Sequence, residues 1–289
     1  MLAVLLACAS AALFGAMAVA VRFALRRIDD PVLGAFATAT IALAVTTAIG
    51  STATAGESLH VSDLWPFVLA GAIAPGLSQV LFTLAISTAG AARTAVLMGT
   101  APLASVAIAL VALHEPLRVP LLVGAALIVA GGVALAGERV RPADFRRLGM
   151  VFAVLATVMF ATRDNLLRWL AGQTEAHALV TAPVTLLAGA AMVAFYLVVT
   201  RGSSWARGYG RAVRVFLPAG LLFGLSYAAL FEAYYRGRVT VVSPLVATES
   251  LWGVLFSVLL LRRSELVGRR LVIGAALIVA GGVLIGAWR

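Results

Sequence analysis

Ten long apolar segments divide this chain, and they constrain its fold more than any other feature of the sequence. A helix needs about 20 consecutive apolar residues to cross a bilayer. Segments of about this length lie near 2–22, 31–50, 64–86, 92–113, 119–137, 148–168, 177–199, 213–235, 239–261 and 269–287. The connections between them are too short for a soluble domain. Within lipid every backbone polar group must be satisfied inside the structure, so we expect an all-α integral membrane protein with ten transmembrane helices.

The composition supports a membrane location. Of the 289 residues, 62% are hydrophobic and 12% are charged, whereas soluble domains are about 45–50% apolar and about 25% charged. The only cysteine, Cys8, lies inside the first apolar segment, which continues to Ala20. We therefore expect a first spanning helix instead of a cleaved signal peptide. The expected location is a multi-pass position in a membrane, with a bacterial inner membrane preferred.

The net charge is +10, and all of the positively charged side chains are arginines, since the sequence contains no lysine. The arginines lie in short loops between apolar segments, which is typical of residues that orient a membrane protein. We therefore expect membrane lipids as partners and no nucleic acid.

The fifth and tenth segments carry nearly the same sequence. Residues 124–133 and 274–283 both read GAALIVAGGV. Further matches at a similar offset are Glu115 with Glu265, Leu13-Phe14-Gly15 with Met159-Phe160-Ala161, and Gly76-Leu77-Ser78 with Gly224-Leu225-Ser226. These matches indicate a duplicated five-helix unit, with one copy at 1–138 and the other at 148–289, together forming one compact membrane domain.

An odd number of spans in the duplicated unit fixes how the copies are related. The second copy must enter the bilayer from the opposite side, so the sequence predicts two inverted repeats. Repeats of this kind are typical of secondary transporters, whose substrate site lies near the bilayer midplane between the repeats.

These residues resemble the drug/metabolite transporter superfamily, in its ten-helix form with two EamA-type repeats. That family has an apolar-Trp-Gly motif in the first helix of each unit, a proline and Gly-Glu in the fourth, and Gly-Ala with Gly-Val in the fifth. The residues that carry the resemblance are Leu13-Phe14-Gly15, Pro102, Glu115, Glu265, Gly124-Ala125, Gly132-Val133, Gly274-Ala275 and Gly282-Val283. Phe14 replaces the tryptophan, and Trp252 stands where the second proline would be. The resemblance implies transport of small metabolites, such as amino acids or purines, often outward.

The orientation of the termini stays open at the level of sequence. The arginine count over the loops places both termini outside, whereas the family resemblance implies that both are inside. An even number of spans requires only that the termini share one side.

Ionisable residues inside spans are costly and usually serve a function. They occur mainly in the second copy: Arg163, Asp164, Glu232 and Glu249 align with uncharged residues of the first copy. This asymmetry indicates a use beyond the shared scaffold.

Glu232 has two interpretations of equal weight. Tyr227, Tyr234 and Tyr235 lie near it on the same helix and offer rings and hydroxyls to a solute. The alternative is a structural ion pair with Arg236, four residues further on.

Glu249 is the acidic residue nearest the middle of its span. Trp252 lies three residues further on and shares its helix face. A carboxylate and an indole together suit a solute pocket, while the alternative is a hydrogen bond between helices.

Arg163 and Asp164 point about 100° apart on a helix, so we do not expect them to pair with each other. Either is a candidate to pair with Glu232 or Glu249, or to contact substrate. Gln79 is a lesser candidate, and Arg93 is expected to be an interfacial anchor.

The glycines of the fifth and tenth segments, Gly124, Gly131, Gly132, Gly274, Gly281 and Gly282, are expected to allow close helix packing. No lysine accompanies them, as a phosphate-binding loop would require. The histidines, His60, His114 and His177, lie far apart and form no metal-ligand spacing. We expect no enzyme activity, no cofactor and no metal.

The sequence as a whole favours a transporter of a small polar solute such as an amino acid, working by alternating access, as a monomer or a homodimer. A proton is a further candidate for coupling. The alternatives are a non-transporting scaffold or receptor and a membrane-embedded enzyme.

Overall fold

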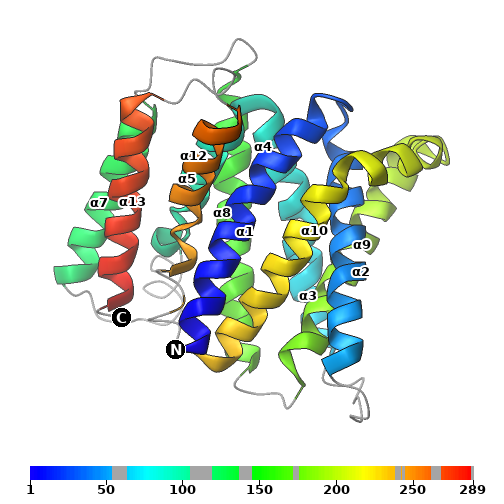
Figure 1. The fold of residues 1–289 in the computed structure, drawn as a ribbon, viewed down its shortest axis with the longest axis horizontal. Helices are drawn as coiled ribbons and strands as arrows, with labels where there is room; N and C mark the ends of the chain where they lie inside the picture. The colour runs from blue at the N-terminus through cyan, green and yellow to red at the C-terminus, as the bar shows by residue number, and fades with distance from the viewer. Residues whose placement is uncertain are drawn as a thin grey trace.

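A computed structural model of the chain describes residues 1–53, 64–104, 119–136, 145–171, 176–237, 242, 245–261 and 268–287, and these residues form a bundle of helices (Figure 1). The helices are α1 (Leu2–Leu25), α2 (Pro31–Ala53), α3 (Trp65–Gly71), α4 (Ser78–Ala89), α5 (Ala91–Met98), α7 (Val119–Ala136), α8 (Leu148–Ala171), α9 (Ala178–Arg201), α10 (Ala206–Arg236), α12 (Glu249–Phe256) and α13 (Arg269–Ala287). Two π-helical segments, Ala72–Leu77 and Ser257–Leu261, extend α3 into α4 and continue α12. No strand occurs among these residues.

Six helical segments in the described part of the chain are long and apolar enough to cross a bilayer. They are Leu2–Leu25, Pro31–Thr52, Trp65–Ala89, Leu148–Leu167, Ala178–Arg201 and Ala206–Arg236. Shorter apolar helices cover Leu122–Leu135 and Glu249–Leu261. The prediction of an all-helical membrane protein therefore agrees with the structure. The predicted count of ten spans is not confirmed, since α5 has only eight residues. Residues 105–118, 239–241 and 243–244, which belong to or adjoin the predicted fourth, fifth and ninth spans, lie outside the described residues.

The third span is interrupted near its middle. Ala74 has an extended backbone, with φ −145° and ψ 120°, and Pro75 follows it. Proline has no backbone N–H and cannot donate the regular helical hydrogen bond. One continuous helix was predicted here, so this break differs from the prediction.

Helices of the two sequence copies pack mainly against each other. α1 of the first copy packs on α10 of the second, and α8, the counterpart of α1, packs on α4 of the first. Counterpart helices also meet directly, since α2 contacts α9, α5 contacts α12, and α7 contacts α13. The core lies where α1, α4, α8 and α10 converge. There the ring of Phe14 lies 5.2 Å from that of Phe82 and 6.0 Å from that of its own counterpart, Phe160.

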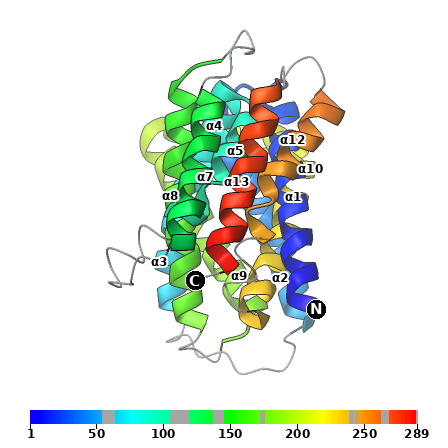
Figure 2. The ribbon, with the colours of Figure 1, turned by 90° about the vertical axis from the view of Figure 1, so that its left-hand side faces the viewer.

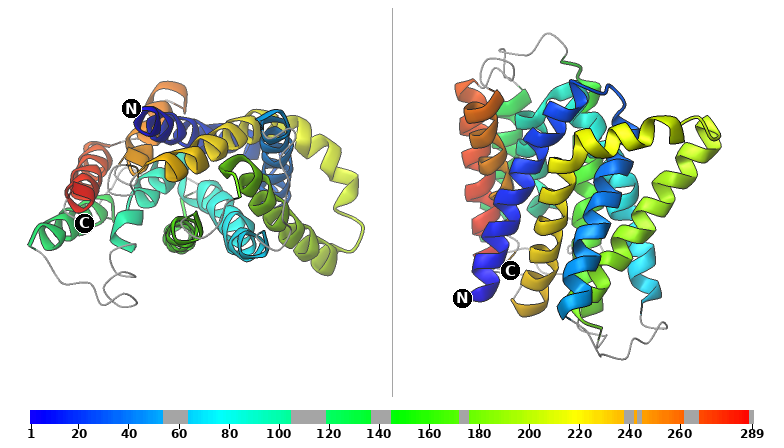
Figure 3. Two further views of the ribbon diagram at one scale, coloured as in Figure 1. Left: turned by 90° about the horizontal axis from the view of Figure 1, so that it is seen from below. Right: turned by 45° about the vertical axis from the view of Figure 1, so that its right-hand side comes forward.

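α7 and α13 lie side by side at one edge of the bundle (Figures 2 and 3). A Cβ atom at Gly131 would lie 2.7 Å from the backbone oxygen of Gly274, and one at Gly281 would lie 2.5 Å from that of Gly124. Early residues of one helix thus meet late residues of the other, so α7 and α13 are antiparallel. Glycine is required at these points because the backbones leave no room for a side chain.

The two remaining glycines of the predicted packing set are placed differently. A Cβ at Gly282 would contact Pro102 at 3.3 Å instead of α7. Around Gly132, no atom of the described residues lies within 4 Å of such a Cβ. Gly132 therefore takes no part in the close contact that we expected of it, because it lies next to Gly131 and projects about 100° away from that contact.

Both ends of the chain lie at the same end of the bundle, where α1 begins and α13 ends (Figure 1). α10 also finishes there, since a Cβ at Gly237 would lie 2.8 Å from Cβ of Ala3. At the opposite end, Arg22 donates to the carbonyl of Ser87 over 3.0 Å. Arg146 also donates its backbone N–H to the carbonyl of Thr88 there, so α8 begins at that end.

An ion pair links the two copies at this opposite end. Arg201, the last residue of α9, donates to both carboxylate oxygens of Asp30, over 2.5 and 3.1 Å. Asp30 also accepts the backbone N–H of Leu33 over 3.1 Å and so caps the start of α2.

Candidate functional site

A cavity of about 50 Å³ lies between the two copies and is lined by residues of both. The first copy contributes Ser10, Phe14, Met98, Ala101 and Pro102, and the second contributes Phe160, Arg163, Asp164, Asn165, Phe223, Ser226, Tyr227, Leu230, Tyr234, Val246, Ala247 and Glu249. Three of these side chains carry a carboxyl or guanidinium group: Arg163 and Asp164 on α8, and Glu249 on α12. The cavity therefore combines an apolar wall with a few polar groups, as ligand sites usually do.

Arg163 is the most constrained of these groups, with 3% of its side chain exposed. Its guanidinium carbon lies 5.2 Å from the ring centroid of Phe160 and 5.1 Å from that of Tyr227. A guanidinium is attracted to aromatic ring faces, so the two rings hold it in place. Nε and Nη1 have no well-aligned hydrogen-bond partner among the described residues. These N–H groups are therefore available to an acceptor that enters the cavity.

Asp164 lies beside Arg163, with 2.8 Å between its Oδ1 and Nη2 of the arginine. The prediction that these neighbours do not pair was wrong. The angle of 100° describes only where the side chains leave the helix, whereas an arginine is long enough to fold back over the adjacent position. In a poorly solvated site an opposite charge compensates much of the cost of burial.

Glu249 lines the same cavity from the first turn of α12 and is buried. A carboxylate in the first turn interacts favourably with the helix dipole. The site thus contains a buried base, a buried acid and a partly buried acid, supplied by elements that are far apart in the sequence.

Hydroxyl groups complete the polar part of the cavity. Tyr227 Oη lies 3.0 Å from Oγ1 of Thr185. Ser10 and Ser226 join α1 to α10, since each hydroxyl lies 2.9 Å from the backbone oxygen of the other residue.

Ser78 is the sequence counterpart of Ser226, and its buried hydroxyl has no hydrogen-bond partner among the described residues. The offset that aligns Phe14 with Phe160 places Ala156 opposite Ser10, so the hydroxyl pair has no equivalent in the other half.

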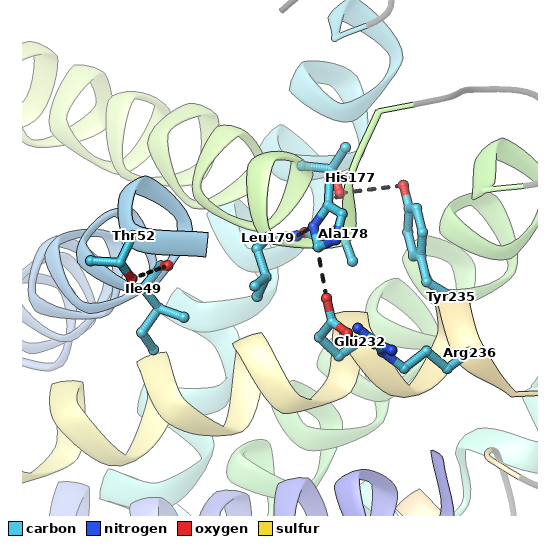
Figure 4. A network of polar contacts seen from close by, with 9 residues as sticks. Ile49, Thr52, His177, Ala178, Leu179, Glu232, Tyr235 and Arg236 are labelled. Carbon is cyan, nitrogen blue, oxygen red and sulfur yellow. Dashed lines mark hydrogen bonds and ion pairs between the residues drawn. The ribbon is translucent and has the colours of Figure 1, made fainter. Parts of the chain in front are cut away.

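Glu232 and Tyr235 lie outside this cavity, near the end of α10 (Figure 4). Glu232 accepts from Arg236 one turn away and lies 3.9 Å from Nδ1 of His177. Tyr235 Oη lies 3.4 Å from Oγ1 of Thr181. The structure thus favours the structural interpretation of Glu232, as part of a cluster that joins α10 to the start of α9.

Three further residues named from the sequence also lie away from the cavity lining. Trp252 stacks on Phe256 with 5.7 Å between ring centroids and packs against the backbone of Gly15. Gln79 is fully buried on α4, and neither atom of its amide has a hydrogen-bond partner among the described residues. Arg93 is also buried, with its guanidinium 5.6 Å from the ring centroid of Phe145.

Several residues of the cavity were not predicted as site residues. Phe14 and Phe160 were predicted only as motif residues, and Ser10 was not predicted at all. The repeat was the available signal for the two phenylalanines, because they occupy equivalent positions in the two copies. Among the histidines, His177 caps α9 by accepting the N–H of Leu179 over 3.3 Å. His60 and His114 lie outside the described residues, as does Glu265. Within the described part of the chain, no three His, Cys, Asp or Glu residues gather as a metal site would require.

Comparison with known proteins relates the fold to a family. No curated protein matches the chain. A solved structure, titled only "Crystal structure of protein", is similar over 98% of this chain and 94% of its own, with a TM-score of 0.68 and 24% sequence identity. At that identity the likeness shows the fold alone. The EamA-like transporter family matches residues 1–136 and, a second time, residues 147–287. The chain therefore belongs to the EamA-like transporter family, with two copies of the family's repeat.

Proposed function

We propose that this protein is a secondary transporter that exports a small polar metabolite, such as an amino acid, by alternating access. The observation that carries the proposal is the cavity between the two copies, where Arg163 and Glu249 are buried and Asp164 is partly buried beside Arg163. Buried charges that face a cavity within a membrane are costly, and they commonly mark a solute or proton pathway.

The arrangement of the helices supports two inverted five-helix repeats. α7 and α13 are counterparts in sequence, and they pack antiparallel through equivalent glycines. The α1–α10 contact has its counterpart in the α8–α4 contact. Such an arrangement gives two states of similar energy, each open to one side, with the site between the repeats.

An amino acid suits the charges of the cavity. Its carboxylate would accept from the free Nε and Nη1 of Arg163, in competition with Asp164. Its ammonium group would lie against Glu249, with the hydroxyls of Tyr227 and Tyr234 nearby. Glu249 is also the carboxylate that we propose for exchange with a coupling proton.

The size of the cavity indicates that the two repeats must separate to admit the substrate. Ligand sites have volumes of about 300–1,000 Å³, whereas this cavity has about 50 Å³. The described conformation is therefore closed around the candidate site. Rocking of one repeat against the other would open it.

The experiment is a flux assay in vesicles containing the purified protein. The substrate is first sought among metabolites that raise the melting temperature, because a ligand that binds only the folded state stabilises it by mass action. Glu249→Gln should lower flux at least about tenfold, the loss that corresponds to about 1.4 kcal/mol, with normal insertion into the membrane.

Glu232→Gln is the matched control, because it removes an acid of the same repeat that lies outside the cavity. We expect its flux to stay within about twofold of the unmodified protein. Undiminished flux in Glu249→Gln would contradict the proposed role of that residue. A complete absence of flux for every stabilising metabolite would favour a receptor or scaffold instead.

A further inference from the structure

A cluster of polar side chains joins the start of α9 to the end of α10, outside the cavity (Figure 4). His177 precedes the first residue of α9, and its Nδ1 accepts the backbone N–H of Leu179 over 3.3 Å. A ring nitrogen that accepts a hydrogen bond carries no proton, so the imidazole is neutral here and has its N–H at Nε2. The cluster therefore contains a histidine whose proton-free nitrogen is held in place by the helix that it caps.

Glu232 places an unused acceptor beside this nitrogen. Its Oε2 accepts from Nε of Arg236, one turn further along α10. Its Oε1 lies 3.9 Å from Nδ1 of His177, is buried, and has no hydrogen-bond partner among the described residues. A buried oxygen without a donor is costly. The two atoms that face each other are thus both acceptors, and a proton between them is what the contact lacks.

Protonation of His177 would supply that donor. Histidine is the side chain that ordinarily titrates between about pH 5 and pH 8. In the imidazolium both nitrogens donate, so Nδ1 can no longer accept from Leu179. A movement of about 1 Å would bring Nδ1 and Oε1 to the separation of a charge-assisted hydrogen bond, about 2.7–2.9 Å. The His177 side chain is 37% exposed, so protons from solvent reach it and the ring has room to move.

The surroundings of His177 offer it no other charged partner among the described residues that pack closely on α9. These belong to α2, α3, the π-helical segment Ala72–Leu77 and α10, and the first three contain no titratable side chain. From α10 the cluster receives Glu232, Arg236 and Tyr235, and the Tyr235 hydroxyl lies 3.4 Å from Oγ1 of Thr181. Glu175 and Arg238 lie outside the described residues.

We propose that His177 and Glu232 form a proton-operated latch between α9 and α10. When His177 is neutral it caps α9, and when it binds a proton it releases the N–H of Leu179 and donates to Oε1 of Glu232. Leu179 also rests on the first copy, since a Cβ at Gly50 of α2 would collide with its carbonyl oxygen. The closed latch therefore ties the end of α10 to a helix start that is packed on the other repeat. The latch is separate from the cavity and does not depend on transport.

The experiment is a double-mutant cycle on the full chain in detergent, with unfolding measured at pH 5.5 and pH 8. The variants are His177→Asn, Glu232→Gln and the double variant. Asparagine keeps an oxygen that caps α9 but cannot become charged. At pH 5.5 the cycle should show a coupling of at least about fivefold in the unfolding equilibrium constant, and at pH 8 a coupling within about twofold of none. Loss of the Arg236 contact occurs in both arms of the cycle and cancels.

Thr181 and Tyr235 provide the matched control, because they join the same two helices through hydroxyl groups that do not titrate in this range. The cycle of Thr181→Val and Tyr235→Phe should give the same coupling at both pH values, within about twofold.

Hydrogen exchange of the Leu179 amide gives a second measurement that needs no change at Glu232. In the unmodified protein its protection, relative to the intrinsic exchange rate at each pH, should fall at least about threefold from pH 8 to pH 5.5, because the N–H loses its acceptor. In His177→Asn the protection should stay constant.

Three outcomes would overturn the proposal. Coupling of equal size at both pH values, or none at pH 5.5, would show that Glu232 does not receive the protonated nitrogen. Unchanged protection of Leu179 in the unmodified protein would show that the cap is never released. Coupling between Thr181 and Tyr235 that changes with pH in the same way would show that acid alters this end of the bundle as a whole.

Discussion

Arg163, which is buried, and Asp164, which is partly buried, form an ion pair in which each charge depends on the other. The guanidinium of Arg163 also lies over the rings of Phe160 and Tyr227, which fixes its position without using all of its N–H groups. Contacts with aromatic rings suit a guanidinium better than an ammonium, because the guanidinium is planar and weakly hydrated. The pair is therefore both a structural element and the side of the cavity that would receive an anionic group.

Removing one member of this pair should cost more stability than removing both. Arg163→Met leaves Asp164 partly buried and unpaired, and we expect a loss of about 3 kcal/mol, the lower end of the range for a buried charge that loses its partner. The double variant Arg163→Met, Asp164→Asn should recover much of that loss. Thermal unfolding in detergent of the two single variants and the double variant gives the coupling energy. Purely additive losses would mean that the two charges do not interact.

Asp30 provides a second ion pair at residue scale, and its stability should depend on pH. Partial burial raises the pKa of Asp30, but the hydrogen bond and charge of Arg201, with the N–H of Leu33, outweigh it and lower the pKa below its ordinary value. A carboxyl with a lowered pKa in the folded state stabilises the protein above the unfolded-state value of about 3.9. That stabilisation is lost as the pH falls through the folded-state pKa.

Asp30→Asn should therefore lower the melting temperature at pH 6 and make a smaller difference at about pH 3, below the unfolded-state value, where the stabilisation is being lost. The variant keeps an acceptor for the cap of α2, so it tests the charge alone. Because the pair is partly exposed, we expect an effect of about 1 kcal/mol or less, decreasing with salt. Asp29→Asn, at an exposed neighbouring position, serves as the control. Melting curves that differ equally at both pH values would contradict the ionic origin of the effect.

At the scale of elements, the closest helix contact is that between α7 and α13. Glycine backbones approach so closely there that each would-be Cβ collides with the partner's backbone. Within a membrane, helix association depends on such packing, because lipid is as apolar as the helices. The identical stretch in the two repeats is thus explained by one surface that packs against its own counterpart.

Gly131 and Gly132 offer a matched test of this contact. Gly131→Val should destabilise the protein by about 1–3 kcal/mol, since a side chain would force the two backbones apart. Gly132→Val should have almost no effect, because a Cβ there meets no atom of the described residues within 4 Å. Unfolding in detergent measures both variants. Equal losses would show that helix propensity, and not packing, sets the cost.

At the scale of the whole molecule, the two repeats interlock instead of standing apart. α1 and α10, and likewise α8 and α4, are neighbours across the sequence copies, so the two repeats share a core in the part of the chain that the structure describes. The candidate site lies within this shared core. Its composition is asymmetric even though the scaffold is nearly symmetric, because Arg163, Asp164 and Glu249 all come from the second repeat.

Inversion of the repeats predicts which sites share a side of the membrane. Cys8 is the only cysteine, so Cys8→Ser gives a background for single cysteines. Asp29→Cys follows the first helix of one repeat and Ala176→Cys follows the first helix of the other. A membrane-impermeant maleimide should label them from opposite sides. Labelling of both from one side would mean parallel repeats, and the proposed alternating access would then fail.

The sequence by itself determined the helical membrane fold, the duplication and the family. Length and hydropathy suffice for spans, because a bilayer requires about 20 apolar residues of any kind in each helix. The tertiary structure alone decided which polar groups meet: it brought Glu249 into the same cavity as Arg163 and Asp164, and it set Glu232, Trp252 and Gln79 apart from it. Periodicity could not reveal this, because the lipid-facing and core-facing sides of these helices are both apolar. Only the packing of α1, α8, α10 and α12 determines which face of each helix borders the cavity.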